Sequence, residues 1–174
     1  MKHSIRLAKI TDLNQVMICI NDAKSFLKSC GLTQWNGSNG YPDRSDLEND
    51  ILNNHLFVCE NDKEIMGVAA FLGAEPQYKK AYGHWLIDTD NYLTIHRVAV
   101  SNKYRGKGIA TLLFEYAYQY AKNKGLDSIR VDTHIGNIPM QSLTKKLDFK
   151  PCGYVIYDYI EVEPKRLIFE KLVH

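Results

Sequence analysis

The chain has 174 residues, of which 45% are hydrophobic, a length and composition typical of one compact domain with a full apolar core. Its 22 basic and 20 acidic side chains give a formal net charge of +2, which disfavours a general positive field for nucleic acid or membrane. The first residues carry no apolar signal core, and no stretch reaches the roughly 18 apolar residues of a membrane span. We therefore expect a single cytoplasmic domain over residues 1–174.

The cysteines and histidines carry no pattern of a metal or disulfide site. The four cysteines are widely spaced and include no Cys-x-x-Cys pair, and no two of the six histidines have metal-ligand spacing. We expect reduced thiols in apolar surroundings and no metal.

The sequence of the first half of the chain indicates two helices, three strands and a loop that carries large aromatic side chains. A helix capped at Thr11-Asp12 runs to Gly31, and the capping box Ser45-Asp-Leu-Glu48 opens a short helix to Asn53. The strands are expected at residues 4–9, 55–60 and 64–73, the last two forming an antiparallel hairpin through the turn Asn61-Asp62-Lys63. Residues 33–44 read as a loop.

Residues 74–91 interrupt the sheet pattern and are interpreted as a loop insertion. The second half then alternates strands and helices. Strands are predicted at 92–100, 128–134, 149–158 and 165–173, and helices at 108–124 and 138–147. This order indicates an α/β fold with a mixed, mostly antiparallel central sheet flanked by helices.

The stretch from Val98 to Thr111 resembles a phosphate cradle, because an apolar strand enters a basic turn that leads straight into a helix. The glycines of this turn, Gly106 and Gly108, allow close backbone approach, and the N–H groups at a helix start attract an anion. Arg105 and Lys107 add positive charge. No Walker or Rossmann glycine spacing is present.

The run Arg105-Gly106-Lys107-Gly108-Ile109-Ala110 reads as [Arg/Gln]-x-x-Gly-x-[Gly/Ala] after an apolar strand, and in this it resembles the GCN5-related N-acetyltransferase (GNAT) family. A second block, residues 137–149, resembles the family pattern Asn-x-x-Ala-x-x-Leu-Tyr-x-Lys-x-Gly-Phe. It departs from that pattern at Met140, at Asp148 in place of the glycine, and at Thr144 in place of a tyrosine proposed to protonate the departing thiolate.

The resemblance implies a GNAT-type sheet, acetyl-coenzyme A (acetyl-CoA) as cosubstrate and a defined set of contacts to it. The strand with Val98 and Val100 would pair with the pantetheine arm, and Asn137 would hydrogen-bond the same arm. The turn would hold the pyrophosphate through the run that begins with Arg105, Gly106 and Lys107 and continues with Gly108, Ile109, Ala110 and Thr111.

Acetyl transfer to an amine needs a base more than an acid. Holding a lysine-like amine neutral at pH 7 costs about 4 to 5 kcal/mol, whereas release of a thiolate costs about 2 kcal/mol. His96 is the first candidate, because in a regular strand it would share a face with Val98 and because one member of the family has a catalytic histidine there. A core histidine bonded to backbone is the open alternative, with His134 and Glu60 in reserve.

These observations predict direct attack of a primary amine on acetyl-CoA in a ternary complex, the acceptor being a small amine, a peptide N-terminus or a lysine. We expect the acceptor pocket to draw on the loops 33–44 and 74–91, with Trp35, Trp85 and Asp88. A non-catalytic acyl-CoA binding or sensor protein is the alternative, and a nucleic-acid-binding role is a weaker third. The oligomeric state, a homodimer included, stays open.

Overall fold

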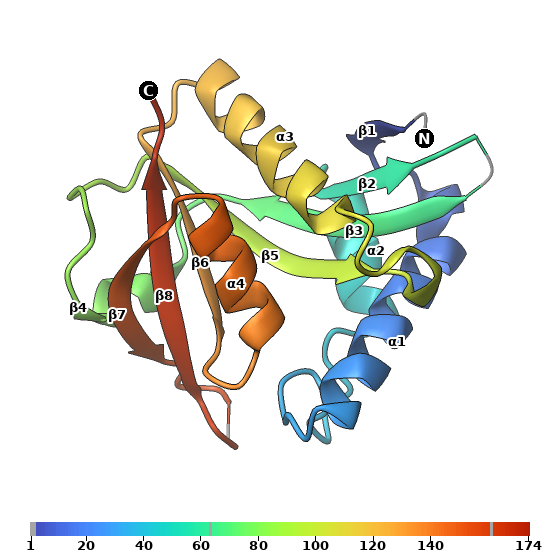
Figure 1. Cartoon of the computed structure of the whole chain (residues 1–174), viewed down its shortest axis with the longest axis horizontal. Helices are drawn as coiled ribbons and strands as arrows, with labels where there is room; N and C mark the ends of the chain where they lie inside the picture. The colour runs from blue at the N-terminus through green and yellow to red at the C-terminus, as the bar shows by residue number, and fades with distance from the viewer. Residues whose placement is uncertain (1–2, 63, 161) are drawn as a thin grey trace. The chain divides into compact units, whose positions relative to one another are not determined.

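The structure is a computed structural model that describes residues 3–62, 64–160 and 162–174. Its backbone contacts group the chain into two compact units. Unit 1 comprises Met1–Phe71 and Arg97–Tyr116, and unit 2 comprises Leu72–His96 and Ala117–His174. Strand β5 (Tyr92–Val100) and helix α3 (Ile109–Asn123) contribute residues to both units, which are described in turn (Figure 1).

Unit 1 contains the strand order β1-β2-β3-β5 together with two helices and the start of α3. The antiparallel neighbours β2 and β3 are almost entirely buried, since both are runs of apolar residues. Gly67 in β3 is needed because a Cβ there would meet Ile109 Cγ2 of α3 at 2.8 Å. The elements of this unit not yet bounded are β1 (Ser4–Leu7), η1 (Ile10–Asp12), α1 (Leu13–Ser29), α2 (Arg44–Leu52), β2 (Leu56–Glu60), β3 (Ile65–Leu72) and η3 (Asn102–Tyr104).

Unit 2 contains the strand order β5-β6-β8-β7-β4. Its pairings are antiparallel apart from the parallel contact of β5 with β6. Figure 1 shows α4 in front of β6 and β8, and Lys171 of β8 donates a 2.8 Å hydrogen bond to the carbonyl of Leu147 at the end of α4. The remaining elements are η2 (Pro76–Lys80), β4 (Tyr82–Gly83), β6 (Ser128–His134), α4 (Ile138–Lys146), β7 (Lys150–Ile156) and β8 (Lys165–Leu172).

An ion pair is enclosed in the core of unit 2. Arg130 Nε donates to Glu170 Oε1 at 2.8 Å, with 5% and 0% of the two side chains exposed. Ser128 Oγ and the Leu86 N–H also donate to this carboxylate, at 2.6 and 2.5 Å. The guanidinium stacks on the rings of Trp85 and Tyr92, 4.2 and 3.9 Å from their centroids. A buried charge pair must be satisfied in this way to be tolerated.

The architecture confirms the predicted α/β fold, with an eight-stranded, mostly antiparallel sheet flanked by helices. Two local predictions were wrong. Helix α2 is capped by Asp43, whose carboxylate accepts the Asp46 N–H at 2.9 Å, so the capping box lies two residues before Ser45. Residues 74–91 are not only loop, because they contain η2 and β4. The β2–β3 hairpin is antiparallel as predicted, although Lys63 of its turn lies outside the described residues.

Candidate active site

In unit 1, the turn between β5 and α3 is built on two glycines in the left-handed region, Gly106 at φ 75° and Gly108 at φ 83°. A Cβ at either glycine would meet nothing within 4 Å, so backbone conformation, not space, selects glycine. The Leu112 N–H donates to the Gly108 carbonyl at 3.0 Å and closes the first turn of α3. The N–H groups of Ile109, Ala110 and Thr111 therefore precede the first N–H that has an acceptor within the helix, and they form the positive end of the helix.

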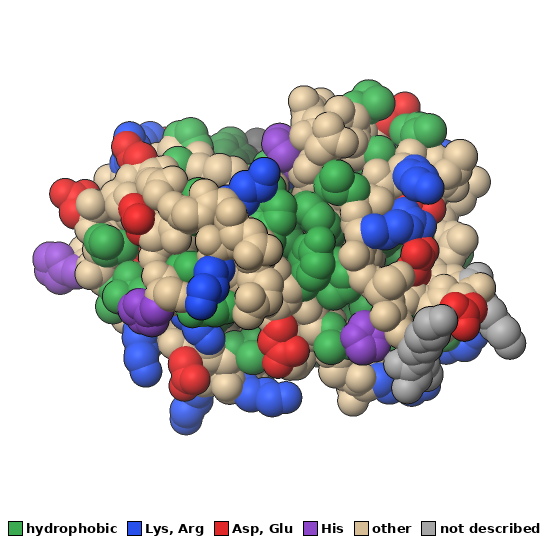
Figure 2. Space-filling view, turned by 90° about the horizontal axis from the view of Figure 1, so that it is seen from above, with side chains coloured by type: hydrophobic (Ala, Val, Ile, Leu, Met, Phe, Trp, Pro, Cys, Tyr) green, Lys and Arg blue, Asp and Glu red, His purple; other side chains and the backbone are tan. Residues whose placement is uncertain are grey.

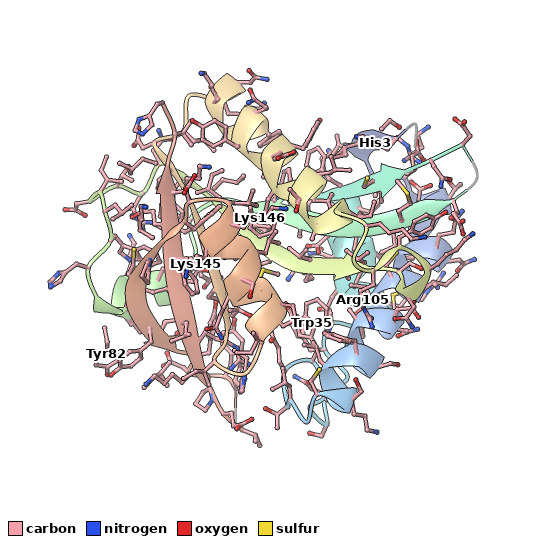
Figure 3. The ribbon with its side chains drawn as sticks, in the orientation of Figure 1. His3, Trp35, Tyr82, Arg105, Lys145 and Lys146 are labelled. Carbon is pink, nitrogen blue, oxygen red and sulfur yellow. The ribbon has the colours of Figure 1, made fainter. Side chains whose placement is uncertain are left out.

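The basic residues of this turn are held by their neighbours in unit 1. Arg105 donates to Asn102 Oδ1 at 2.5 Å and lies 4.1 Å from the ring centroid of Phe26, and Figure 3 shows it beside α1. Lys103 forms an exposed ion pair with Glu64. The Lys107 ammonium lies 5.2 Å from the Tyr104 ring centroid, and its backbone N–H bonds the Tyr104 carbonyl.

Strand β5 is irregular immediately before the cradle. Arg97 has φ 52°, a left-handed conformation that breaks the alternation of side chains along a strand. The shared face expected for His96 and Val98 depended on a regular strand, and β5 does not meet that condition at Arg97. The Arg97 guanidinium is fixed within unit 1, donating to both oxygens of the buried Asp50 at 2.6 and 2.8 Å and to Tyr41 Oη at 2.8 Å.

The parallel ladder between β5 and β6 is short. The pairs formed by the described residues run from Tyr92 with Ser128 to Thr94 with Arg130. His96 and Asp132 each lie two residues beyond the last pair, in the stretch where the ladder has ended. Backbone groups beyond a ladder's end are open to another partner.

His96 lies among polar groups of unit 2. Its Nε2 is 3.6 Å from Glu75 Oε2, and only 18% and 19% of the two side chains are exposed. Nε2 is enclosed and has no hydrogen-bond partner among the described residues. The ring centroid of Tyr78 is 6.5 Å from that of His96.

Two buried tyrosines share one carboxylate oxygen next to this histidine. Tyr78 and Tyr157 each donate to Asp132 Oδ2 at 2.7 Å. Burial, followed by the negative charge of Asp132, raises the pKa of both phenols well above the usual range. The hydroxyls therefore stay protonated and keep Asp132 supplied with donors. Sequence reasoning missed this group and Glu75, because an irregular insertion gives no periodic signal.

The comparisons with known proteins bear on the whole chain. The family model described as "Acetyltransferase (GNAT) family" matches residues 23–149. A solved structure of a GNAT-family acetyltransferase from Streptococcus agalactiae is 34% identical, covers 99% of this chain and 96% of its own, and superimposes with a TM-score of 0.85. The chain belongs to the acetyltransferase (GNAT) family. This confirms the resemblance found in the sequence.

Of two curated relatives, one has a lower sequence identity and the other matches a shorter part of the chain. An uncharacterized N-acetyltransferase of Bacillus subtilis, YesJ, is 24% identical over 132 residues, which are 74% of this chain and 71% of the relative. Streptothricin acetyltransferase of Escherichia coli is 35% identical over 66 residues, 38% of each chain.

The structure shows the local contacts of three residues in the second GNAT block, residues 137–149. Asp148 has φ 62°, and the Phe149 N–H returns to the Thr144 carbonyl at 3.0 Å, a helix ending that normally takes glycine. Thr144 is fully buried, and its hydroxyl donates to the Gln141 carbonyl at 2.9 Å. Asn137 caps α4, its Oδ1 accepting the Met140 N–H at 3.3 Å. Its contact with a cofactor stays a prediction.

The two reserve bases have structural partners. His134 Nδ1 accepts the Gly136 N–H at 3.0 Å while Nε2 lies 3.3 Å from Glu163 Oε2. Glu60 is bound by Arg6 at 2.6 and 2.8 Å, and these hydrogen bonds lower the pKa of Glu60. Neither group therefore replaces His96 as the first candidate.

The predicted acceptor loops fall in different units. The loop 33–44 belongs to unit 1, where Trp35 has φ 62°. Trp85 belongs to unit 2 and packs against its core, with Nε1 donating to the Tyr78 carbonyl at 3.3 Å. Asp88 is exposed. A shared acceptor pocket stays a prediction, and the packing of Trp85 gives it a structural role in addition.

The thiols offer no obvious acyl carrier. Burial raises the pKa of Cys19 to about 12 and those of Cys59 and Cys152 to about 11, so these three are thiols at neutral pH. Cys30 is exposed and unpaired. Within residues 3–62, 64–160 and 162–174 there is no cluster of three metal-ligating side chains and no helix long and apolar enough to span a membrane.

Proposed function

We propose that this GNAT-family protein is an N-acetyltransferase that moves acetyl from acetyl-CoA to a primary amine by direct attack in a ternary complex. The observation that carries the proposal is the start of α3, where two left-handed glycines precede three N–H groups that have no acceptor inside the helix. Because the family model draws on residues of both units, we propose further that residues 1–174 act as one domain.

The turn fits the pyrophosphate of acetyl-CoA. The positive helix end offers N–H donors, Gly106 and Gly108 leave room for close approach, and Lys107 and Arg105 supply charge next to it. In our proposal Val98 and Val100 offer backbone groups to the pantetheine arm, and Asn137 contributes from α4. Acetyl-CoA, when bound, supplies an acetyl group activated as a thioester.

His96 is proposed as the base that accepts the proton of the acceptor amine, directly or through one water. Deprotonation is the larger cost, about 4 to 5 kcal/mol at pH 7 for a lysine-like amine. The position of His96, with Nε2 enclosed beside the Glu75 carboxylate and the ring near Tyr78, supports a proton-accepting role. The Thr144 hydroxyl is committed to a backbone carbonyl, so in our proposal the thiolate leaves without help from position 144.

One observation favours a second function. Because the position of the expected general acid holds a fixed threonine, a protein that binds acyl-CoA without turnover is the alternative. A nucleic-acid-binding role has less support, since Figure 2 shows Lys and Arg side chains interspersed with Asp and Glu on the face in view.

Release of the coenzyme A thiol, measured across a panel of acceptors, separates the two functions. The panel contains alkyl amines, polyamines, amino acids, streptothricin, and peptides with a free N-terminus or an internal lysine. We expect acceptor-dependent thiol release with at least one amine. Tight binding of acetyl-CoA without acceptor-dependent release from any member would contradict the enzymatic function and favour the sensor.

A further inference from the structure

Glu75 is held within unit 2 through both its carboxylate and its backbone N–H. Its Oε1 accepts the Gln77 N–H at 3.0 Å, capping η2, and Pro76 follows as the first residue of that turn. The backbone N–H of Glu75 donates to Tyr92 Oη at 3.0 Å. One oxygen is thus used for the cap, and the other, Oε2, is directed at His96 Nε2, 3.6 Å away.

Among the described residues, the facing nitrogen of His96 has no competing hydrogen-bond partner. Nε2 of His96 is enclosed and makes no hydrogen bond to any described residue, and 3.6 Å is an electrostatic contact longer than a hydrogen bond. Catalytic hydrogen bonds are often this long without substrate and tighten in the substrate complex.

Three other charged groups of unit 2 already have partners. Asp132 accepts from Tyr78 and Tyr157, and the Arg166 guanidinium donates to the carbonyls of Glu163 and Lys165. Asp158 is paired with Lys80 of η2. Glu75 is therefore the carboxylate that the structure sets against Nε2.

We propose that Glu75 is a positioning residue that fixes the tautomer of His96, an inference that rests on the proposed role of His96 as base. A neutral imidazole carries one N–H and one lone pair. A carboxylate attracts the N–H and repels the lone pair, so Glu75 selects the form with the proton on Nε2. The lone pair is then on Nδ1, which accepts the amine proton, and the imidazolium that forms is stabilised by the adjacent carboxylate.

Glu75→Gln tests this assignment sharply. The amide oxygen still accepts the Gln77 N–H, but its NH₂ group now faces Nε2 and favours a lone pair there, with the proton on Nδ1. Nitrogen-15 NMR in alkaline buffer reads the tautomer, and the difference spectrum against His96→Gln assigns the signal. Wild type should show the Nε2–H form, Glu75→Gln the inverted form, and Glu75→Asp, which keeps a carboxylate, the wild-type form.

Asp158→Asn is the matched control, the same exchange of carboxylate for amide at a residue paired with Lys80 of η2, and it should leave the tautomer unchanged. We expect Glu75→Gln to lower kcat by about 10-fold to 100-fold, the range for residues that orient a functional histidine, with KM for acetyl-CoA unaltered. An unchanged tautomer in folded Glu75→Gln overturns the proposal, and this result is readable even if the wild type acetylates no amine. Inversion without loss of kcat overturns the catalytic part.

Discussion

Replacing Gly108 by glutamate tests the cradle, because it places a carboxylate at the helix start that is proposed to hold the pyrophosphate. The side chain has room, since a Cβ at Gly108 meets nothing within 4 Å. The left-handed φ of 83° costs a non-glycine residue about 1 to 2 kcal/mol of stability. The repulsion between two unit charges about 5 Å apart is about 3 kcal/mol at an effective dielectric constant of about 20.

That repulsion corresponds to a loss of acetyl-CoA affinity of about 100-fold or more. Isothermal titration calorimetry measures it, and urea unfolding shows that the variant is folded. Gly125→Glu is the matched control, because Gly125 also has positive φ, 66°, and open space, but lies after the C-terminus of α3. Gly125→Glu should lose at least as much stability as Gly108→Glu, because its carboxylate is repelled by the negative end of the helix. Its affinity for acetyl-CoA should be unchanged. Equal affinities of the two variants would refute the cradle.

The remaining predictions concern proton transfer, the ion pair of Arg97 in β5 with Asp50, and the thiols. His96→Ala should lower kcat by roughly 100-fold and remove the acidic limb of the pH–rate profile, whereas Thr144→Ala should change kcat far less; equal losses would show that position 144 takes part. Asp50→Asn should lower the free energy of unfolding by about 3 kcal/mol, because it leaves Arg97 buried without its counter-charge; an unchanged urea midpoint would contradict this. Native alkylation should modify Cys30 alone of the four cysteines and spare activity, and a loss of activity would reopen a covalent route.

The sequence predicts well those parts of the fold that rest on periodicity and on glycine. Strand β6 is found at its predicted residues, and α3 begins one residue after Gly108, because apolar repeats and a left-handed turn residue are local signals. The structure also explains why the family pattern has a glycine where this chain has Asp148, a residue at φ 62°.

The environment of the proposed base could not be predicted in the same way. The Arg97 side chain is held by Asp50 and Tyr41, which are 47 and 56 residues away in sequence. Glu75 and Tyr78 lie in an irregular insertion, and their partners Tyr92 and Asp132 come from two different strands. Contacts of this kind are set by tertiary packing, so no local pattern in the sequence indicates them.

Transfer of an isotopically labelled acetyl group tests the central claim most directly. The protein is mixed with acetyl-CoA labelled in the acetyl carbons and with the best acceptor of the panel, and the products are separated by mass spectrometry. We predict one labelled acetyl on an acceptor nitrogen for each coenzyme A released, and an unlabelled protein when the acceptor is omitted. Label on the protein before the acceptor is added, or coenzyme A release without an acetylated amine, would contradict direct transfer to an amine.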